Sequence, residues 1–261
     1  MTILPKAGYA GELRLYGDAE QLAGAGAELF VDKAADALKA HRRFRVALSG
    51  GSTPRRVYEL LATPAFRSRV GWDQIDIFWG DERYVPADDH DSNYRMTADA
   101  LLRQVSVPAA NVHRVPTEIY PPEAAAATYE REIRQCFGES VAVPRFDLIY
   151  LGLGTNGHMA SLFPHSPTLK ETSKLVLADF VAEVNSWRIS MSTPLLNRGR
   201  TVAFLIEGGQ KAQVLYDVLL GPRDPERLPA QLIAPEGNLL WLVDEAAAAR
   251  VLSTGRERRS A

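Results

Sequence analysis

The apolar and polar positions of this chain form two alternating patterns. Short, mostly apolar runs between polar or glycine-containing segments predict β-strands at 44–48, 75–79, 146–151, 188–191, 201–206 and 239–243. Between these runs, apolar residues recur at three- and four-residue steps, which predicts amphipathic helices at 18–40, 54–61, 93–102, 121–137 and 209–219. In the longest of them, one face carries Ala23, Ala27, Phe30, Ala34 and Ala37. Strands that alternate with helices indicate an α/β fold whose mainly parallel sheet is covered by helices on both faces.

The chain is expected to form a single domain over residues 1–261. Its 261 residues, 46% of them hydrophobic, are enough to bury a sizeable core. Too little chain follows the proline-rich stretch 222–229 to make a second domain, so this stretch is interpreted as a surface loop.

Composition and charge exclude several classes of partner. The formal net charge is −2 and the sequence pI about 6.2, so no global positive field favours nucleic acid. The N-terminal residues lack the features of a signal peptide, and no apolar run approaches the roughly 20 residues that span a bilayer. The single cysteine, Cys136, excludes an internal disulfide and is interpreted as a small buried side chain. We therefore expect a soluble cytoplasmic protein that binds neither nucleic acid nor membranes, either a monomer or a dimer.

Polar, glycine-containing segments follow four of the predicted strands, at 49–53, 80–83, 152–158 and 208–211. In a parallel sheet the loops after the strands share one edge, and ligands bind in the crevice there. The sequence therefore predicts that these segments form one site.

The first segment has the character of an anion cradle. Gly50 and Gly51 let the backbone approach a ligand closely, and a helix N-terminus follows at Pro54. Ser49 and Ser52 offer hydroxyl groups. The lysine of a P-loop is missing. The alternative for this segment alone is an ordinary tight turn capped by a hydroxyl side chain.

Two cations are candidates for holding a phosphate. Arg188 lies in an apolar strand, where a guanidinium needs a partner, and phosphate is a good one through bidentate hydrogen bonds. Lys211 follows two glycines near the start of a helix. The alternatives are a structural salt bridge for Arg188 and a solvated side chain for Lys211.

The third segment matches the glycine spacing of a dinucleotide fingerprint at Gly152, Gly154 and Gly157. That fingerprint also needs a crossover helix beginning at the third glycine. Pro164 and Pro167 limit any such helix to a turn or two, which argues against a nucleotide site.

The chemistry of a general base points to His158 in the same segment. Glycines around it permit a backbone conformation that projects the imidazole into the crevice, and histidine is the usual base near neutral pH. The alternative is a histidine that only caps the following helical turn. Asp81, Glu82 and Arg83 concentrate charge after another strand, unless they form only a solvated turn. The five histidines show no metal-ligand spacing, so neither a metal nor another cofactor is expected.

These segments resemble the signature blocks of the 6-phosphogluconolactonase family, in the same order over nearly the whole chain. The matching blocks are 49–54, 80–85, 91–94, 152–164, 208–211 and 229–231. The resemblance implies a modified Rossmann-like fold, shared with glucosamine-6-phosphate deaminases. It also implies hydrolysis of a small-molecule phosphosugar lactone, 6-phospho-D-glucono-1,5-lactone, to 6-phosphogluconate, the second step of the oxidative pentose phosphate pathway.

The resemblance further implies roles for individual residues. The phosphate site would be lined by Ser49, Gly50, Gly51, Ser52, Arg188 and Lys211. His158 would be the base that activates water, Arg83 would polarise the carbonyl or orient the substrate, and Asp81 would shape the same pocket.

One position departs from the family pattern, which has aspartate where this chain has Asn156. An asparagine oxygen can accept a hydrogen bond from His158 but adds no charge. We expect either a weaker base or a compensating charge from Asp81 or Glu82. The alternative is that Asn156 points into solvent.

Two rival functions stay open on the sequence. An amino-sugar phosphate isomerase-deaminase of the same superfamily would follow its histidine with a glutamate-containing block, whereas residues 160–164 contain no carboxylate. A non-catalytic phosphosugar-binding module is the other alternative, disfavoured by the absence of an appended helix-turn-helix and of a basic face.

Overall fold

The computed structural model describes residues 2–4 and 10–260, and its main element is a seven-stranded sheet. In spatial order the strands are β1 (Thr2–Leu4), β2 (Glu12–Tyr16), β10 (Asn238–Asp244), β9 (Thr201–Ile206), β6 (Leu148–Leu151), β3 (Phe44–Leu48) and β4 (Ile75–Trp79). All neighbours are parallel except β1 and β2. The expectation of a mainly parallel α/β sheet is confirmed.

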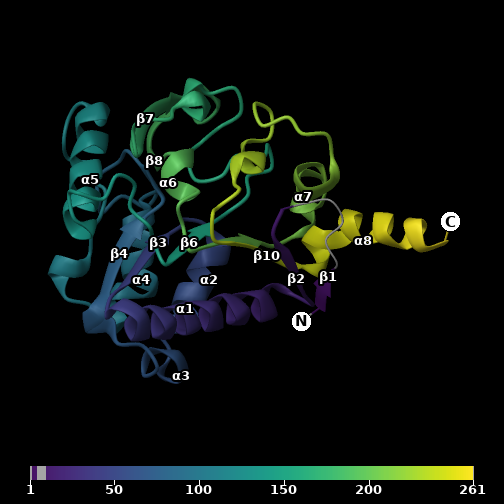
Figure 1. The fold of residues 1–261 in the computed structure, drawn as a ribbon, viewed down its shortest axis with the longest axis horizontal. Helices are drawn as coiled ribbons and strands as arrows, with labels where there is room; N and C mark the ends of the chain where they lie inside the picture. The colour runs from purple at the N-terminus through teal and green to yellow at the C-terminus, as the bar shows by residue number, and fades with distance from the viewer. Residues whose placement is uncertain (1, 5–9, 261) are drawn as a thin grey trace.

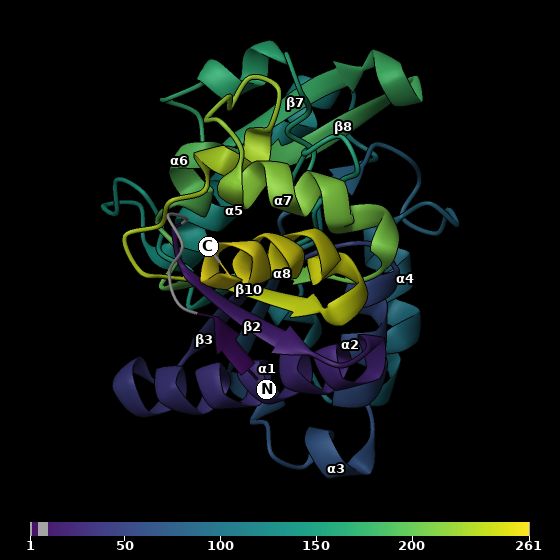
Figure 2. The same cartoon turned by 90° about the vertical axis from the view of Figure 1, so that its right-hand side faces the viewer.

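Helices cover both faces of this sheet (Figure 1). One layer contains α1 (Ala19–His41), α2 (Ser52–Leu61), α3 (Pro64–Arg67) and α4 (Asn93–Ala100). The other contains α5 (Pro122–Phe137), α6 (Thr193–Leu196), α7 (Ala212–Leu220) and α8 (Glu245–Ser260). Figure 2 shows α7 and α8 on one side of β10 and α1 on the other.

The central strands are mostly apolar because each contributes side chains to two cores. In β9, Val202, Phe204 and Ile206 pack into the core beneath α5, α7 and α8. The alternate residues Ala203 and Leu205 pack into the core beneath α1 and α2. Since successive side chains of a strand point to opposite faces, a strand buried on both sides shows a continuous apolar run.

A second, three-stranded antiparallel sheet was not expected. Its order is β5 (Asp81–Arg83), β8 (Ser186–Met191) and β7 (Val176–Val181). The segment after β4, interpreted as a loop, is therefore partly strand, and the strand predicted at 188–191 pairs here rather than in the main sheet. Because β5 begins two residues after β4 ends, this small sheet is joined to the carboxyl edge of the main sheet.

Two tyrosines fix the carboxyl ends of β3 and β4. The Tyr58 hydroxyl donates to the Ser49 carbonyl and accepts from the Ser49 amide, both at 2.9 Å. Tyr129 makes the same pair of bonds with Trp79, at 3.0 and 2.8 Å. Both tyrosines are buried, so the points at which the loops leave the sheet are firmly set.

Boundaries of most elements lie within a few residues of those predicted. Strands β1, β2 and β7 and helix α8 were not predicted, and the helix expected at 209–219 begins with a 3₁₀ turn at Gly209–Lys211. Among the described helices, none combines the length and the apolarity needed to cross a membrane.

Candidate functional site

A pocket of about 470 Å³ lies at the carboxyl edge of the main sheet, where β9, β6, β3 and β4 are neighbours. The polar, glycine-containing segments all begin at this edge, as the strand order dictates. Every predicted site residue lines the pocket, namely Ser49, Gly50, Gly51, Ser52, Asp81, Arg83, Asn156, His158, Arg188 and Lys211.

The Ser49–Ser52 segment joins β3 to α2 in a conformation that depends on its glycines. Gly51 has φ +104°, a value that residues with side chains rarely adopt. A Cβ atom at Gly50 would lie 1.9 Å from Oδ1 of Asn93. Asn93 is itself fixed by a 2.9 Å hydrogen bond from Nδ2 to the Asp81 carbonyl. The segment thus presents backbone amides at the start of α2, which suits an anion.

The cationic side of the pocket is formed by Arg83, Arg188 and Lys211. Arg83 and Arg188 are directly opposite each other on β5 and β8. Among the ion pairs of the described residues none involves these three side chains, and Arg188 Nε is buried without a hydrogen-bond partner there. Burial, reinforced by Arg83, lowers the pKa of Arg188, and burial lowers that of Lys211. The predicted alternative of a structural salt bridge for Arg188 is wrong.

Lys211 is positioned through Asp244 at the end of β10. Both carboxylate oxygens of Asp244 accept hydrogen bonds from the Gly208 amide, at 3.1 and 3.0 Å, and one also accepts from the Ala247 amide at 2.7 Å. Gly208 has φ +90°, so the chain turns sharply there into the 3₁₀ turn that carries Lys211.

His158 lies in a closed turn between β6 and the small sheet. The Gly154 amide donates to the His158 carbonyl at 2.8 Å, and the Gly157 amide donates to the Gly154 carbonyl at 3.0 Å. The imidazole stacks on Phe163 with ring centroids 4.2 Å apart. A Cβ at Gly154 would come within 2.0 Å of His158 Nδ1, so glycine is needed there for the ring to occupy its place.

Asn156 holds the imidazole from the other side. Its Oδ1 lies 2.6 Å from His158 Nδ1 and 3.2 Å from the His158 amide nitrogen. The alternative that Asn156 points into solvent is therefore wrong. Burial, followed by the charges of Lys211, Arg188 and Arg83, lowers the pKa of His158 to about 4. The ring is consequently neutral near pH 7, as a base must be.

Asp81 and Glu82 do not place a charge beside Asn156 and His158, because both carboxylates are hydrogen-bonded elsewhere. Asp81 accepts a 2.6 Å hydrogen bond from Ser161 Oγ, which ties β5 to the His158 turn. Glu82 accepts from the backbone amides of Arg83, Asn93 and Tyr94 at 2.7 to 2.8 Å, and so fixes the start of α4. Burial raises the pKa of Glu82 to about 6, although these amides lower it.

The carboxylate that does reach Asn156 is Glu183, which sequence reasoning missed. Asn156 Nδ2 lies 3.1 and 2.9 Å from its two oxygens. Glu183 sits in the turn between β7 and β8, and β7 was not predicted because its residues do not form one continuous apolar run. The stacking of Phe163 on the His158 ring was also missed, because the spacing of residues along the sequence does not show which side chain covers a ring.

The dinucleotide alternative is not supported. After Gly157, the described chain contains only the 3₁₀ turns Pro167–Lys170 and Ala182–Val184 and two strands before α6 begins at Thr193. The crossover helix that such a site requires is absent from this part of the structure.

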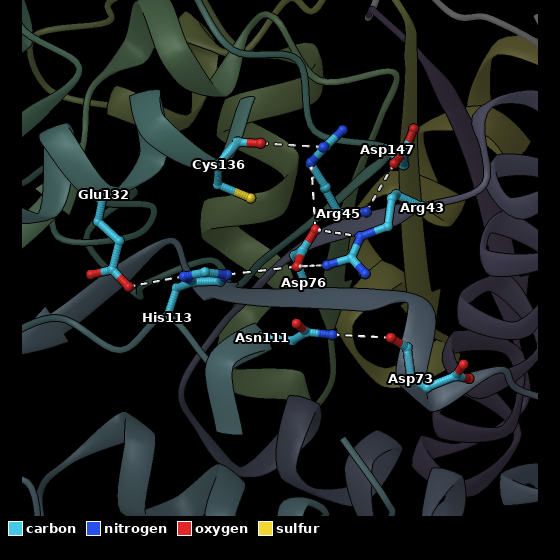
Figure 3. Close-up of polar contacts among 9 residues, drawn as sticks. All are labelled: Arg43, Arg45, Asp73, Asp76, Asn111, His113, Glu132, Cys136 and Asp147. Carbon is cyan, nitrogen blue, oxygen red and sulfur yellow. Dashed lines mark hydrogen bonds and ion pairs between the residues drawn. The ribbon is translucent and has the colours of Figure 1, made fainter. Parts of the chain in front are cut away.

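A second polar cluster, drawn in Figure 3, lies at the amino-terminal ends of β3 and β4. Asp76, His113 and Cys136 bring potential metal-ligand atoms within 4.8 Å of one another. However, Asp76 pairs with Arg43 and lies 3.6 Å from Nε of Arg45. These positive charges already compensate the carboxylate, so the cluster has the character of an ionic network.

His113 is the centre of this network. Its Nδ1 lies 2.9 Å from Glu132 Oε1 and its Nε2 is 3.7 Å from Asp76 Oδ1, an ion-pair distance. Burial acts to lower the pKa of His113, but Asp76, Cys136 and Glu132 together raise it to about 11. Cys136, expected to be a small buried side chain, is only partly buried, and it packs against one of the two cores.

Comparison with known proteins gives consistent matches over almost the whole chain. Residues 17–241 match the family described as glucosamine-6-phosphate isomerases/6-phosphogluconolactonase. A 6-phosphogluconolactonase of Synechocystis is 45% identical over 203 residues, 77% of this chain and 82% of that protein. The human 6-phosphogluconolactonase is 36% identical over 96% of this chain and 97% of its own length. The solved 6-phosphogluconolactonase of Trypanosoma brucei superposes with a TM-score of 0.82 at 28% identity, covering 93% of this chain and 99% of that one.

Proposed function

The chain belongs to the glucosamine-6-phosphate isomerase/6-phosphogluconolactonase family, and we propose that it hydrolyses 6-phospho-D-glucono-1,5-lactone to 6-phosphogluconate. One observation carries the proposal beyond the family. A neutral imidazole faces the same pocket as three cations that have no ion-pair partner among the described residues. A substrate with a phosphate group would complement the cations, and its reactive carbonyl would complement the neutral imidazole. We further propose that residues 1–261 act as one domain.

The phosphate is held at the Ser49–Ser52 segment. Backbone amides at the start of α2 and the hydroxyls of Ser49 and Ser52 donate hydrogen bonds, while Arg188 and Lys211 supply positive charge. The unpartnered Nε of Arg188 acquires an acceptor when the phosphate binds.

The lactone ring extends toward His158. Its Nε2 takes a proton from water as the water oxygen bonds to the carbonyl carbon, and Arg83 stabilises the negative charge that develops on the carbonyl oxygen. The ester C–O bond then breaks, the ring oxygen leaves as a hydroxyl with the proton from the imidazolium, and the new carboxylic acid ionises. No electron transfer is involved, and no step requires a metal.

The low pKa of His158 is compatible with this role because the substrate changes its surroundings. Part of the depression comes from Lys211, Arg188 and Arg83. A bound phosphate, carrying about −1.5 to −2 charges, offsets these cations and makes the imidazole more basic in the complex than in the free protein. Substrate binding and base strength are thereby coupled.

The isomerase-deaminase alternative is disfavoured by the surroundings of the base. Where that chemistry would need a carboxylate after the histidine, Phe163 packs against the ring at 4.2 Å. A non-catalytic phosphosugar-binding module would have no use for a neutral imidazole with Nε2 free of protein partners among the described residues.

The direct test is an assay with freshly prepared 6-phosphogluconolactone, following acid release with a pH indicator and subtracting spontaneous hydrolysis. Glucosamine 6-phosphate is run in parallel, with ammonia release as the readout. We expect turnover of the lactone alone. Ammonia release without acceleration of lactone hydrolysis would establish the deaminase instead, and binding of 6-phosphogluconate without turnover of either would indicate a binding module.

A further inference from the structure

A continuous chain of hydrogen bonds links Glu183 to the imidazole of His158 through the side-chain amide of Asn156. Both oxygens of Glu183 lie within 3.1 Å of Asn156 Nδ2. Asn156 Oδ1 lies 2.6 Å from His158 Nδ1. The chain connects two separate parts of the fold, the turn between β7 and β8 and the loop after β6.

The carboxylate decides which way the amide faces. An ionised carboxylate only accepts hydrogen bonds, so the NH₂ group of Asn156 must point toward Glu183 and its oxygen toward His158. The oxygen is an acceptor, and His158 Nδ1 therefore carries the ring proton. Nε2 is left with its lone pair, the state that a general base requires.

The opposite amide orientation would have the opposite effect. If the NH₂ group of Asn156 faced the imidazole, Nδ1 would have to accept and the proton would move to Nε2. The ring would then present a donor to the pocket and could not take a proton from water. The second hydrogen bond to Oδ1, from the His158 amide at 3.2 Å, favours the productive orientation but is longer than the bonds to Glu183.

We propose that Glu183 is a positioning residue that fixes the catalytic tautomer of His158 by orienting the amide of Asn156. Its catalytic consequence rests on the proposed lactonase function, but its effect on the tautomer does not. Glu183 is exposed and, among the described residues, its side chain is hydrogen-bonded to Asn156 alone. Replacing it therefore leaves the cores of the fold intact.

The test compares Glu183→Ala with Glu183→Gln. Glutamine removes the charge but keeps one acceptor oxygen. Alanine removes the charge and both acceptor oxygens. Glu139→Ala, which removes an exposed glutamate away from the pocket, is the matched control. The tautomer is read from the imidazole ¹⁵N chemical shifts of His158, assigned with a His158→Gln sample, and kcat is measured on the lactone.

We expect the wild type and Glu139→Ala to hold the proton on Nδ1, with similar kcat. Glu183→Gln should lie between them and Glu183→Ala, because its oxygen can accept from Asn156 but its NH₂ group can also donate to the Asn156 oxygen and turn the amide. Glu183→Ala should contain a substantial fraction of the Nε2–H tautomer and lose about 10-fold in kcat, the usual cost of removing a partner that orients a functional imidazole. The loss should be smaller than the roughly 10²–10⁴-fold that a general base contributes.

An unchanged tautomer in Glu183→Ala would overturn the proposal, whatever happened to kcat. It would also be overturned if Glu183→Gln lost kcat without any shift of the tautomer, since the charge and not the amide orientation would then matter. A wild type that does not hydrolyse the lactone, combined with a tautomer shift in Glu183→Ala, would reject the proposed function and keep the positioning role.

Discussion

Arg83 and Arg188 lie directly opposite each other on neighbouring antiparallel strands, with no carboxylate paired to either among the described residues. Like charges at directly opposed positions of a sheet are destabilising. The charge of Arg83 also lowers the pKa of Arg188. The nearby carboxylates of Asp81, Asp91 and Glu82 offset this repulsion in part, and an anion bound between the two arginines would offset it further.

Removing Arg188 or Lys211 should chiefly weaken binding of the phosphorylated lactone. Arg188→Ala and Lys211→Ala should raise KM for 6-phosphogluconolactone about 10-fold or more, with a smaller loss in kcat, because remote binding energy also orients the reacting carbonyl. Unphosphorylated gluconolactone should be a poor substrate for the wild type and lose little further. The exposed Arg223→Ala is the control. Equal losses on both lactones would show that these side chains do not bind the phosphate.

His158→Ala should remove most of the activity while leaving product binding largely intact. A general base contributes about 10²–10⁴-fold, so kcat should fall by at least about 100-fold once spontaneous hydrolysis is subtracted. Binding of 6-phosphogluconate, measured by calorimetry, should change little. A variant that keeps more than about a tenth of the wild-type kcat would exclude His158 as the base.

The pKa of His158 should respond to the cations and to the ligand. In the free protein it lies at about 4, so the imidazole is neutral near pH 7 and the base is lost only as the pH falls through that value. Arg188→Ala and Lys211→Ala should each raise the pKa of His158, since both charges lower it in the wild type. Saturation with 6-phosphogluconate should raise it as well. An NMR titration of the imidazole measures all four states, and a pKa insensitive to the ligand would contradict the coupling.

Asn156→Asp tests how charge beside His158 affects its basicity. A carboxylate in contact with Nδ1 should raise the pKa of the ring and shift the acidic limb of the kcat profile to higher pH. However, Glu183 lies 2.9 Å from Asn156 Nδ2, so the new carboxylate would meet an existing one and one of the two would tend to hold a proton. The shift should therefore be clearest in Asn156→Asp combined with Glu183→Gln. An unchanged profile in this folded double variant would remove residue 156 from the mechanism.

The ionic network around His113 should stabilise the fold in a defined pH window. Its pKa is raised from 6.5 to about 11, so its contribution is fully present below about pH 6.5 and is lost as the pH rises toward 11. Asp76 acts in the other direction. Burial tends to raise its pKa, but His113 and Arg43 lower it below 3.8, so its contribution is present above that pH and is lost in acid.

Urea unfolding at pH 7 and pH 10 measures this contribution. We expect the wild type to lose more free energy of unfolding between these pH values than His113→Gln does. His90→Gln, which removes an exposed histidine, controls for the general effect of alkaline pH and should behave like the wild type. If His113→Gln lost as much as the wild type, protonated His113 would not be part of the network.

Local sequence predicted the central strands and helices well because their signals are local. Phe44–Leu48, Ile75–Trp79 and Thr201–Ile206 are observed at their predicted bounds. Each is mostly apolar because it is buried on both faces, although Arg45 and Asp76 interrupt the first two runs. In contrast, β7 (Val176–Val181) includes an aspartate and an exposed phenylalanine, and β5 is only three residues long, so neither produced a recognisable pattern.

The sequence by itself determined which polar, glycine-containing segments gather at the pocket. Once strands and helices alternate, handedness and parallel pairing leave the loops after the strands only one edge to share. What the tertiary structure alone decided is how these residues are paired. The opposition of Arg83 and Arg188 depends on the register of β5 with β8, and the contact of Glu183 with Asn156 depends on where the turn between β7 and β8 comes to rest. Those relations join residues about 30 to 100 positions apart, and a hydrogen bond over such a separation leaves no periodic trace in the chain.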